Sequence, residues 1–360
     1  MPVTLDALNI ATEHLLPKLE NLFFDDHPWL ARIILNGIDR RPSGGEYAAF
    51  VVTTDGPGNI VKLLTGSEAY AYGRRNITQQ ARVFIGTHLY TFAVEGEALR
   101  HSDGETGIAN LLQVYPEAGM LDFRQRAVGQ NLTGNGAAAN ADGWVTVNGD
   151  QTYNPDGTAL SGVLDFATPA AQTDTVFNLP KQGAANGVTG WYNQYGNVLS
   201  FGSSGKRIMR DVYNACHIRS GTWNSPPDLG LTDSTSYNNY YESLDDNVRY
   251  ATTLKGEDGA TGRDGLMFHK LELFIEPSID DNLTFFGHGT NGTTYMFNTK
   301  TWFILTLGQD ASKETKGFFE VRPPFKLQGR DAWGYEIVCA WQIGCRYLKA
   351  NGCLEGTAII

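Results

Sequence analysis

The chain has 360 residues and a formal net charge of −11, and 41% of its residues are hydrophobic. That apolar content can fill two or three compact cores. The acidic balance argues against a dedicated nucleic-acid binder, which draws affinity from lysine and arginine. The sequence has no secretion signal and no apolar run near the roughly 20 residues that span a bilayer. We therefore expect a soluble, cytoplasmic protein without a membrane partner.

The middle of the chain is rich in asparagine, threonine, aspartate and glycine, and the whole chain contains 41 glycines. These residue types favour turns and short strands over a helical bundle. Because helical patterns also occur, we predict an α+β fold.

The first predicted elements are helical. Leucines recur at helical spacing between residues 5 and 23, which predicts an amphipathic arm. Pro28 then stands at a helix start and Gly37 just after a helix end, so a second short helix is expected between them. The preceding residues resemble metal ligands, but acidic residues and a turn before proline are typical of a helix start, so we predict no metal site there. Those residues are Asp25, Asp26 and His27.

Residues 45 to 95 contain runs rich in valine, isoleucine, phenylalanine, tyrosine and threonine, interrupted by glycine, proline and asparagine. This pattern predicts a long β-hairpin with apolar residues on both faces, more than an isolated ribbon should expose. A capping-box pattern at Ser102 and Glu105 then begins a predicted helix over about 103 to 132, which Pro116 must kink or divide.

Residues 133 to 143 are small and polar, which indicates a linker and a domain boundary. Beyond them, turn-rich β segments are interrupted by one predicted helix over 203 to 217, which begins at Ser203 or Ser204. Near the C-terminus, apolar and polar residues alternate over 335 to 347, which predicts a long strand.

All four cysteines are predicted to be reduced thiols. They form no C-x-x-C pair, and no histidine lies at zinc-finger spacing. Cys339 and Cys345 share one face of the predicted strand but stand roughly 20 Å apart along it, so they cannot form a disulfide. The other two are Cys216 and Cys353.

Three local patterns that would carry chemistry are incomplete. "FGSSGKR" at 201–207 has Ser200 where a phosphate-binding loop needs glycine, and Arg207 where it needs serine or threonine. "NGDQTYNPDG" at 148–157 lacks the acidic residue that completes a calcium loop. "GEDGATGRDG" at 256–265 has collagen-like triplets without proline, so we expect a solvated loop there.

The remaining candidates for chemistry are scattered. His269 and Glu272 stand three residues apart, but in a β-like stretch where they face opposite sides. We therefore predict no catalytic, cofactor-binding or metal-binding residues and no enzymatic activity. A β-rich carbohydrate-active enzyme stays an alternative, because three aromatic residues could line a sugar site, although such residues are more often core or interface. They are Trp191, Tyr192 and Tyr195.

The order of these elements resembles the major capsid protein of tailed bacteriophages, the Hong Kong 97-type fold also seen in bacterial encapsulins. "LLPKLENLFFDDHPWLARI" is similar to that family's N-terminal arm entering its first short helix. "PPDLGLTDSTSYNNYYESL" at 226–244 is similar to the central domain's strand followed by a helix. "GLMFHKLELFIEPSIDDN" and "TTYMFNTKTWFILTL" resemble the paired strands that lead out of that domain.

The resemblance implies a division of the chain into four parts. Residues 1–44 would be the N-terminal arm and 45–98 an extended β-hairpin loop. Residues 99–133, with a long spine helix, and about 301–360 would form the peripheral domain, and residues 134–300 would form the axial domain.

The resemblance also implies a function. The chain would assemble into hexamers and pentamers of an icosahedral virion shell, in the host bacterial cytoplasm, around packaged double-stranded DNA that it does not bind sequence-specifically. Scaffolding, portal and decoration proteins are further candidate partners. Lys62 lies on the hairpin where some relatives form a covalent crosslink, but we expect an ordinary charged edge residue. The residues expected at subunit contacts are Trp29, Phe50, Val52, Lys62, Leu64, Arg74 and Arg75.

Two further alternatives stay open at this point. An encapsulin-like nanocompartment would have the same fold with a different cargo. A phage tail or receptor-binding protein would instead form trimers and fibres.

Overall fold

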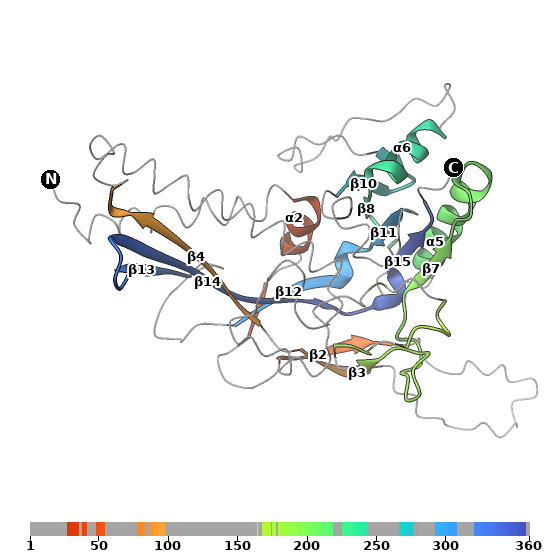
Figure 1. Cartoon of the computed structure of the whole chain (residues 1–360). Helices are drawn as coiled ribbons and strands as arrows, with labels where there is room; N and C mark the ends of the chain where they lie inside the picture. The colour runs from red at the N-terminus through yellow and green to blue at the C-terminus, as the bar shows by residue number, and fades with distance from the viewer. Residues whose placement is uncertain are drawn as a thin grey trace, which may run out of the picture.

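The computed structural model describes the parts of the chain in which the two sheets and their covering helices lie (Figure 1). These are residues 27–35, 38–41, 48–54, 78–83, 86–97, 164, 168–173, 175–177, 179–218, 225–243, 266–276, 279, 292–307 and 320–357. Several predictions lie outside the described residues: the arm before residue 27, the helix over 103–132 with Pro116, the linker at 133–143, the patterns at 148–157 and 256–265, and Lys62, Leu64, Arg74 and Arg75.

The first sheet has five strands and runs through the middle and left of Figure 1. Its longest strand, β14, pairs antiparallel with three others, and β12 also pairs with β1 in parallel. The strands are β1 (Ile38–Arg41), β4 (Gly86–Glu95), β12 (Trp302–Leu307), β13 (Glu320–Lys326) and β14 (Ala332–Cys345).

The long strand predicted over 335 to 347 is therefore confirmed, although β14 begins earlier, at Ala332. Its predicted apolar face is buried where the structure describes it, because it packs between other parts of the chain. The buried members of that face are Tyr335, Ile337, Trp341, Ile343, Cys345 and Tyr347.

The second sheet has six strands in the order β7–β15–β11–β8–β10–β9. Strands β7 and β15 are parallel, as are β8 and β10, and the other neighbours are antiparallel. The bounds are β7 (Gln194–Asn197), β8 (Leu229–Thr232), β9 (Leu266–Phe268), β10 (Leu271–Ile275), β11 (Thr293–Phe297) and β15 (Gly352–Glu355).

Helices cover both faces of this sheet. α5 (Lys206–Ile218) and α6 (Ser234–Glu242) pack with one core cluster, and α2 (Pro28–Leu35) packs with the other. Strand alternation explains the division, because Leu271 and Leu273 of β10 belong to the α5 cluster while Phe274 belongs to the α2 cluster.

The helix predictions are confirmed for this part of the chain. α5 follows one π-helical turn at Phe201–Gly205, so the regular helix begins slightly later than predicted. Before α6, the Asp233 carboxylate accepts a hydrogen bond from the Ser236 N–H at 2.8 Å, which caps the helix as expected for this residue type. β8 and α6 together form the strand-then-helix segment expected at 226–244.

The hairpin predicted over 45 to 95 is confirmed only for the pair of β2 (Ala48–Thr53) and β3 (Thr78–Val83), because β4 from the same stretch pairs with β14 in the first sheet. The inner face of this two-stranded ribbon packs inside the chain, because the Phe50 ring lies 5.1 Å from the Phe303 ring and 5.4 Å from the Phe177 ring. Val51 points outward and is 62% exposed. The inner face of β2 is therefore covered within the chain, and contact of this ribbon with a neighbouring subunit stays a prediction. A second small ribbon joins β5 (Thr175–Val176) and β6 (Leu179–Pro180).

The change from one sheet to the other falls between β11 and β12, close to the boundary expected near residue 300. β15 departs from that division: residues 352–355 were assigned to the peripheral domain, but they pair with β7 and β11 in the six-stranded sheet. The domain assignment itself stays a prediction, while the mixed α and β architecture is confirmed.

Candidate functional site: the joint between the sheets and the surfaces beside it

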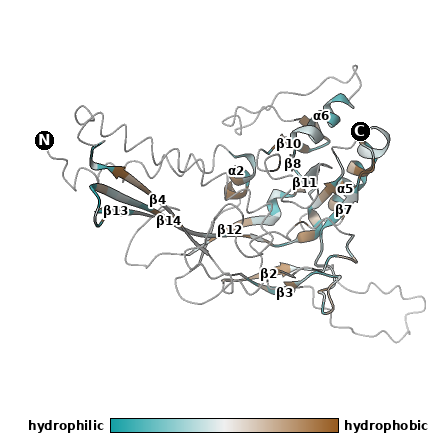
Figure 2. Ribbon diagram, viewed as in Figure 1, coloured by the Kyte–Doolittle hydropathy of each residue, from teal (hydrophilic) through white to brown (hydrophobic). Residues whose placement is uncertain are grey.

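Side chains on both faces of β12 pack against other parts of the chain. Because consecutive strand residues face opposite sides, Trp302 points toward α2 and Phe303 toward the β2 ribbon. The Trp302 ring lies 5.9 Å from that of Trp29, and the Phe303 ring lies 5.1 Å from that of Phe50. Figure 2 shows brown, hydrophobic residues on α2 and β2, the two elements that flank this strand. The centre of the molecule is thus an aromatic joint.

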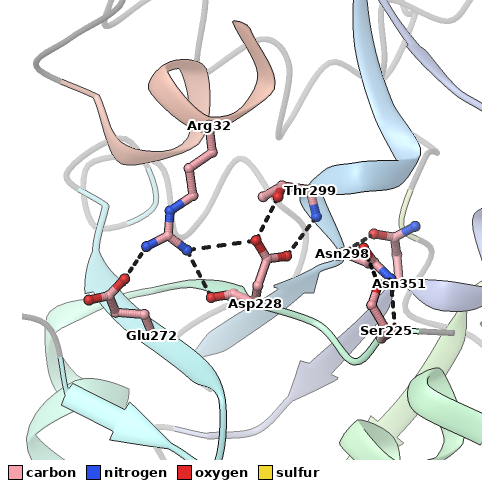
Figure 3. A network of polar contacts seen from close by, with 7 residues as sticks. All are labelled: Arg32, Ser225, Asp228, Glu272, Asn298, Thr299 and Asn351. Atoms are coloured by element: carbon pink, nitrogen blue, oxygen red, sulfur yellow. Dashed lines mark hydrogen bonds and ion pairs between the residues drawn. The ribbon is translucent and has the colours of Figure 1, made fainter. Parts of the chain in front are cut away.

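Arg32 connects α2 to the six-stranded sheet (Figure 3). One guanidinium nitrogen donates to the Asp228 carbonyl at 2.9 Å, and the other forms an ion pair with the Glu272 carboxylate. Glu272 is buried, so this pair exists in a poorly solvated environment where an unpaired charge would be costly. Arg32 therefore fixes the position of α2 on the sheet.

The Asp228 side chain extends the network to the connection between the sheets. Its two carboxylate oxygens accept hydrogen bonds from the Thr299 N–H at 2.8 Å and the Thr299 hydroxyl at 2.6 Å. Thr299 lies in the short turn between β11 and β12, where the chain passes from one sheet to the other. One aspartate thus anchors that crossover, and Figure 3 shows it facing both Arg32 and Thr299.

Two asparagines also form hydrogen bonds at this connection between β11 and β12. The Asn351 side-chain oxygen accepts from the Asn298 N–H and from the Trp302 indole N–H, each at 2.9 Å. The Asn298 amide group donates to the Ser225 carbonyl at 2.9 Å. These buried groups satisfy one another, which rigidifies the joint.

A second buried contact links α2 to β10. His27 Nε2 lies 2.5 Å from the Glu276 carboxylate, and both residues are buried. The predicted helix-start role of residues 25 to 27 is consistent with α2 beginning at Pro28. Among the described residues, no group of three or more histidine, cysteine or acidic side chains could hold a metal ion.

The residues considered above as candidates for catalysis or sugar binding take part in packing and hydrogen bonds within the fold. His269 lies in the turn between β9 and β10, and not in a strand as expected, where it stacks on the Tyr213 ring at 5.3 Å; Glu272 of β10 forms an ion pair with Arg32. Trp191 is fully buried, and the Tyr195 hydroxyl donates to Glu355 at 2.9 Å. Burial and that hydrogen bond raise the pKa of Tyr195 well above its ordinary value. A sugar site at these aromatics has no support in this geometry.

The cysteine prediction is confirmed for the three thiols that the structure describes. Cys216, Cys345 and Cys353 are buried and form no disulfide. Burial raises the pKa of the Cys345 thiol to about 12, which disfavours the reactive thiolate. The side chain of Cys339 lies outside the described residues.

The predicted contact residues divide into two groups. Trp29, Phe50 and Val52 are buried inside this chain, where they form the aromatic joint and its lining, so their role between subunits stays a prediction. The remaining four lie outside the described residues, as noted above.

Sequence reasoning missed the exposed apolar residues of the five-stranded sheet. Leu89 on β4 is 38% exposed and Phe325 on β13 is 43% exposed. They flank β14 on the same face, because Leu89 pairs with Val338 and Phe325 with Gly334. Two features of the sequence could have indicated these exposed residues: the two prolines before Phe325 and the alternation of apolar and polar residues in β4. In the described part of the chain, no helix is long and apolar enough to cross a membrane.

The fold of this chain is similar to that of a solved viral capsid structure. A solved structure with this fold is the capsid asymmetric unit of cyanophage A-1(L), with a TM-score of 0.55 and 12% sequence identity over 92% of this chain and 93% of that chain. The resemblance to tailed-phage capsid proteins is confirmed at the level of fold. No protein-family model and no curated protein matches the chain.

Two other solved structures match this chain with lower TM-scores. The mature capsid of bacteriophage PhiM1 gives a TM-score of 0.47 at 7% identity, over 89% of this chain and 85% of that chain. The SrpI encapsulin complex from Synechococcus elongatus PCC 7942 also gives 0.47, at 8% identity over 92% of this chain and 88% of that chain.

Proposed function

We propose that the chain is the major capsid protein of a tailed bacteriophage. It assembles into hexamers and pentamers of an icosahedral shell in the host bacterial cytoplasm, and that shell becomes the virion capsid around double-stranded DNA. The observation that carries this proposal is the match to the cyanophage A-1(L) capsid over almost the full length of both chains. The role is structural and not enzymatic.

The charge of the chain supports an enclosing role without sequence-specific DNA binding. A subunit with a net charge of −11 repels phosphate, so a wall built from it does not hold tightly packed DNA. Scaffolding, portal and decoration proteins are proposed as further partners.

The extended loop is proposed to cover a neighbouring subunit. Its base is rigid, because Thr53 donates its N–H to the Arg346 carbonyl at 2.9 Å and Phe50 is held in the aromatic joint. The loop between Thr54 and Thr78 contains Lys62, Leu64, Arg74 and Arg75, the proposed contact residues. The exposed face with Leu89 and Phe325 offers apolar surface that such a contact would bury.

Electron microscopy of the expressed protein tests the proposal. Closed shells or capsomer rings are expected, and a monodisperse monomer by light scattering under all assembly conditions would contradict it. Shells that contain a protein cargo and no DNA in the native host would instead indicate a nanocompartment, and trimeric fibres a tail protein.

A loop replacement tests the contact separately. Replacing residues 55–77 by a short Gly-Ser linker leaves β2 and β3 in place, including the buried Ala81. We expect an unchanged circular dichroism spectrum and loss of shells. Shells of normal size from this variant would show that the loop is not the interlocking element.

A further inference from the structure

Asn351 and Gly352 form a pair that can undergo spontaneous deamidation. In such a pair, the glycine nitrogen loses its proton and attacks the side-chain carbonyl carbon of the asparagine, which expels ammonia and closes a five-membered succinimide ring. Water then opens the ring to aspartate or isoaspartate, so the net reaction consumes one water and releases one ammonia. Glycine favours the attack because no Cβ hinders its nitrogen. The pair lies at the aromatic joint, where Asn351 supports the connection between β11 and β12.

The structure requires both residues of this pair. A Cβ on Gly352 would lie 2.8 Å from Val212 Cγ1 and 2.9 Å from Cys216 Sγ, so α5 would have to move to admit a larger residue. The Asn351 side chain both accepts and donates hydrogen bonds inside the joint, which an amide can do and a carboxylate cannot. Packing and hydrogen bonding therefore keep a chemically labile pair at this position.

The closed joint prevents the succinimide ring from forming. The Asn351 amide group is fully buried and donates to the Thr301 hydroxyl and the Tyr347 carbonyl, each at 3.1 Å. The backbone carbonyl of Asn351 accepts from the Gln194 N–H at 2.9 Å, and its ψ of 153° keeps the chain extended. Ring closure needs the Gly352 nitrogen to rotate toward the side chain, which would break this bond and the pairing of β15 with β7 and β11. The reaction therefore requires the joint to open.

Neither product of the reaction fits the closed joint. A carboxylate at position 351 would face the Tyr347 carbonyl and the oxygen of Thr301, whose hydroxyl already donates to the Asn298 carbonyl at 2.8 Å. A buried charge that loses its hydrogen bonds is costly. Isoaspartate also adds one carbon to the backbone immediately before β15, which displaces that strand from its partners. A modified chain is thus hindered from closing the joint again.

We propose that Asn351 is a deamidation site that reacts only while the joint between the two sheets is open. A chain that closes the joint promptly keeps its asparagine. A chain that stays open acquires a carboxylate and loses the hydrogen bonds with which the joint closes, so the modification removes slowly folding and misfolded chains irreversibly. The proposal concerns a single chain and does not depend on the capsid function.

Peptide mass spectrometry after incubation at mildly alkaline pH tests the site. We expect conversion at Asn351 to be slower by about tenfold or more in the folded chain than in urea, because only rare opening exposes it. W302A, which weakens the joint, should raise conversion at Asn351 in native buffer by about tenfold or more. Asn186, which is exposed and also precedes a glycine, is the control in the same digest and should convert equally in W302A and in the unmodified chain.

Two outcomes of this measurement would overturn the site. They are conversion at Asn351 that is as fast in the folded chain as in urea, and conversion that does not increase in a folded W302A. If W302A does not fold, the comparison of the unmodified chain with and without urea decides alone.

A matched pair of variants tests the effect of the product. N351D carries one of the two products inside the joint, and N186D makes the same change in an exposed turn. We expect N351D to have a lower melting temperature and a lower refolding yield from urea, and N186D to match the unmodified chain. An N351D variant that refolds and melts like the unmodified chain would show that the carboxylate fits the joint, which contradicts the proposal.

Discussion

The joint around β12 and the far end of β14 differ in what covers them. At the joint, Trp302 and Phe303 are buried on opposite faces of one strand by parts of the same chain. At the far end, Leu89 and Phe325 remain partly exposed on either side of β14. The first region is stabilised by contacts within the chain, whereas the second exposes apolar surface that the proposed shell contact would bury. Substitutions should therefore affect folding at one end and assembly at the other.

The largest effect on stability is expected at the joint. W302A removes a fully buried ring that packs against Trp29 and leaves the Asn351 oxygen with one hydrogen bond fewer. We expect a loss of about 4 kcal/mol in the free energy of unfolding, as for other large core truncations. Urea denaturation measures it, and a loss below about 1 kcal/mol would show that the joint is not the core.

A somewhat smaller loss is expected when Arg32 is replaced. R32M leaves the Glu272 carboxylate buried without its cation, which should cost about 3 kcal/mol. The double variant R32M/E272L removes both charges and should recover most of that stability. If the double variant is no better than R32M, Arg32 acts through packing on Phe274, 5.9 Å from its guanidinium, and not through the ion pair.

Alkaline pH should destabilise the chain gradually. Burial raises the pKa of Tyr240 and of Tyr335 from the ordinary 10.0 to about 12 in the folded state. Between these values the unfolded chain releases the protons first, so the stabilisation is complete below pH 10 and is lost as the pH rises toward 12. Thermal melts across this range should show a falling melting temperature.

Replacement of one tyrosine separates this titration from general alkaline damage. The Tyr335 hydroxyl is buried without a hydrogen-bond partner among the described residues, so Y335F should fold normally. Its melting temperature should fall less steeply with pH than that of the unmodified chain. An identical slope in both proteins would assign the alkaline effect to other groups.

The smallest effect on stability is expected at the far end of β14. F325S changes a side chain that is 43% exposed, so the free energy of unfolding should change by less than about 0.5 kcal/mol. Shell yield should nevertheless fall, because apolar contact surface is lost. A variant that unfolds easily yet still assembles would reverse the comparison between the two regions.

Local patterns were sufficient where neighbouring residues decide the structure. The alternation over 335 to 347 predicted β14, and a serine at the helix start predicted α5. The polar network could not be read from the sequence, because Arg32 meets Asp228 and Glu272 from 196 and 240 residues away. Such pairings depend on how the sheets are arranged in space.

The sequence shows which apolar residues need to be covered, but not which part of the chain, or which other chain, covers them. The pattern of β2 identified Phe50 and Val52 as needing cover, but a single strand does not indicate whether that cover comes from its own chain or from another. The partner residues, Phe177 and Phe303, lie far along the sequence. For the same reason, no local pattern indicates whether exposed apolar residues such as Leu199, before the π-helical turn, and Ile218, at the end of α5, have a partner.

The return of β15 to the six-stranded sheet has a consequence for synthesis. One sheet needs β12 and β14, and the other needs β11 and β15, so neither can close until the ribosome has made the C-terminal part of the chain. Strands made earlier, such as β4 and β8, must wait for these partners, and long-range pairing of this kind is slow. A prematurely terminated chain therefore lacks strands from both sheets, which excludes it from any larger structure that the complete chain builds.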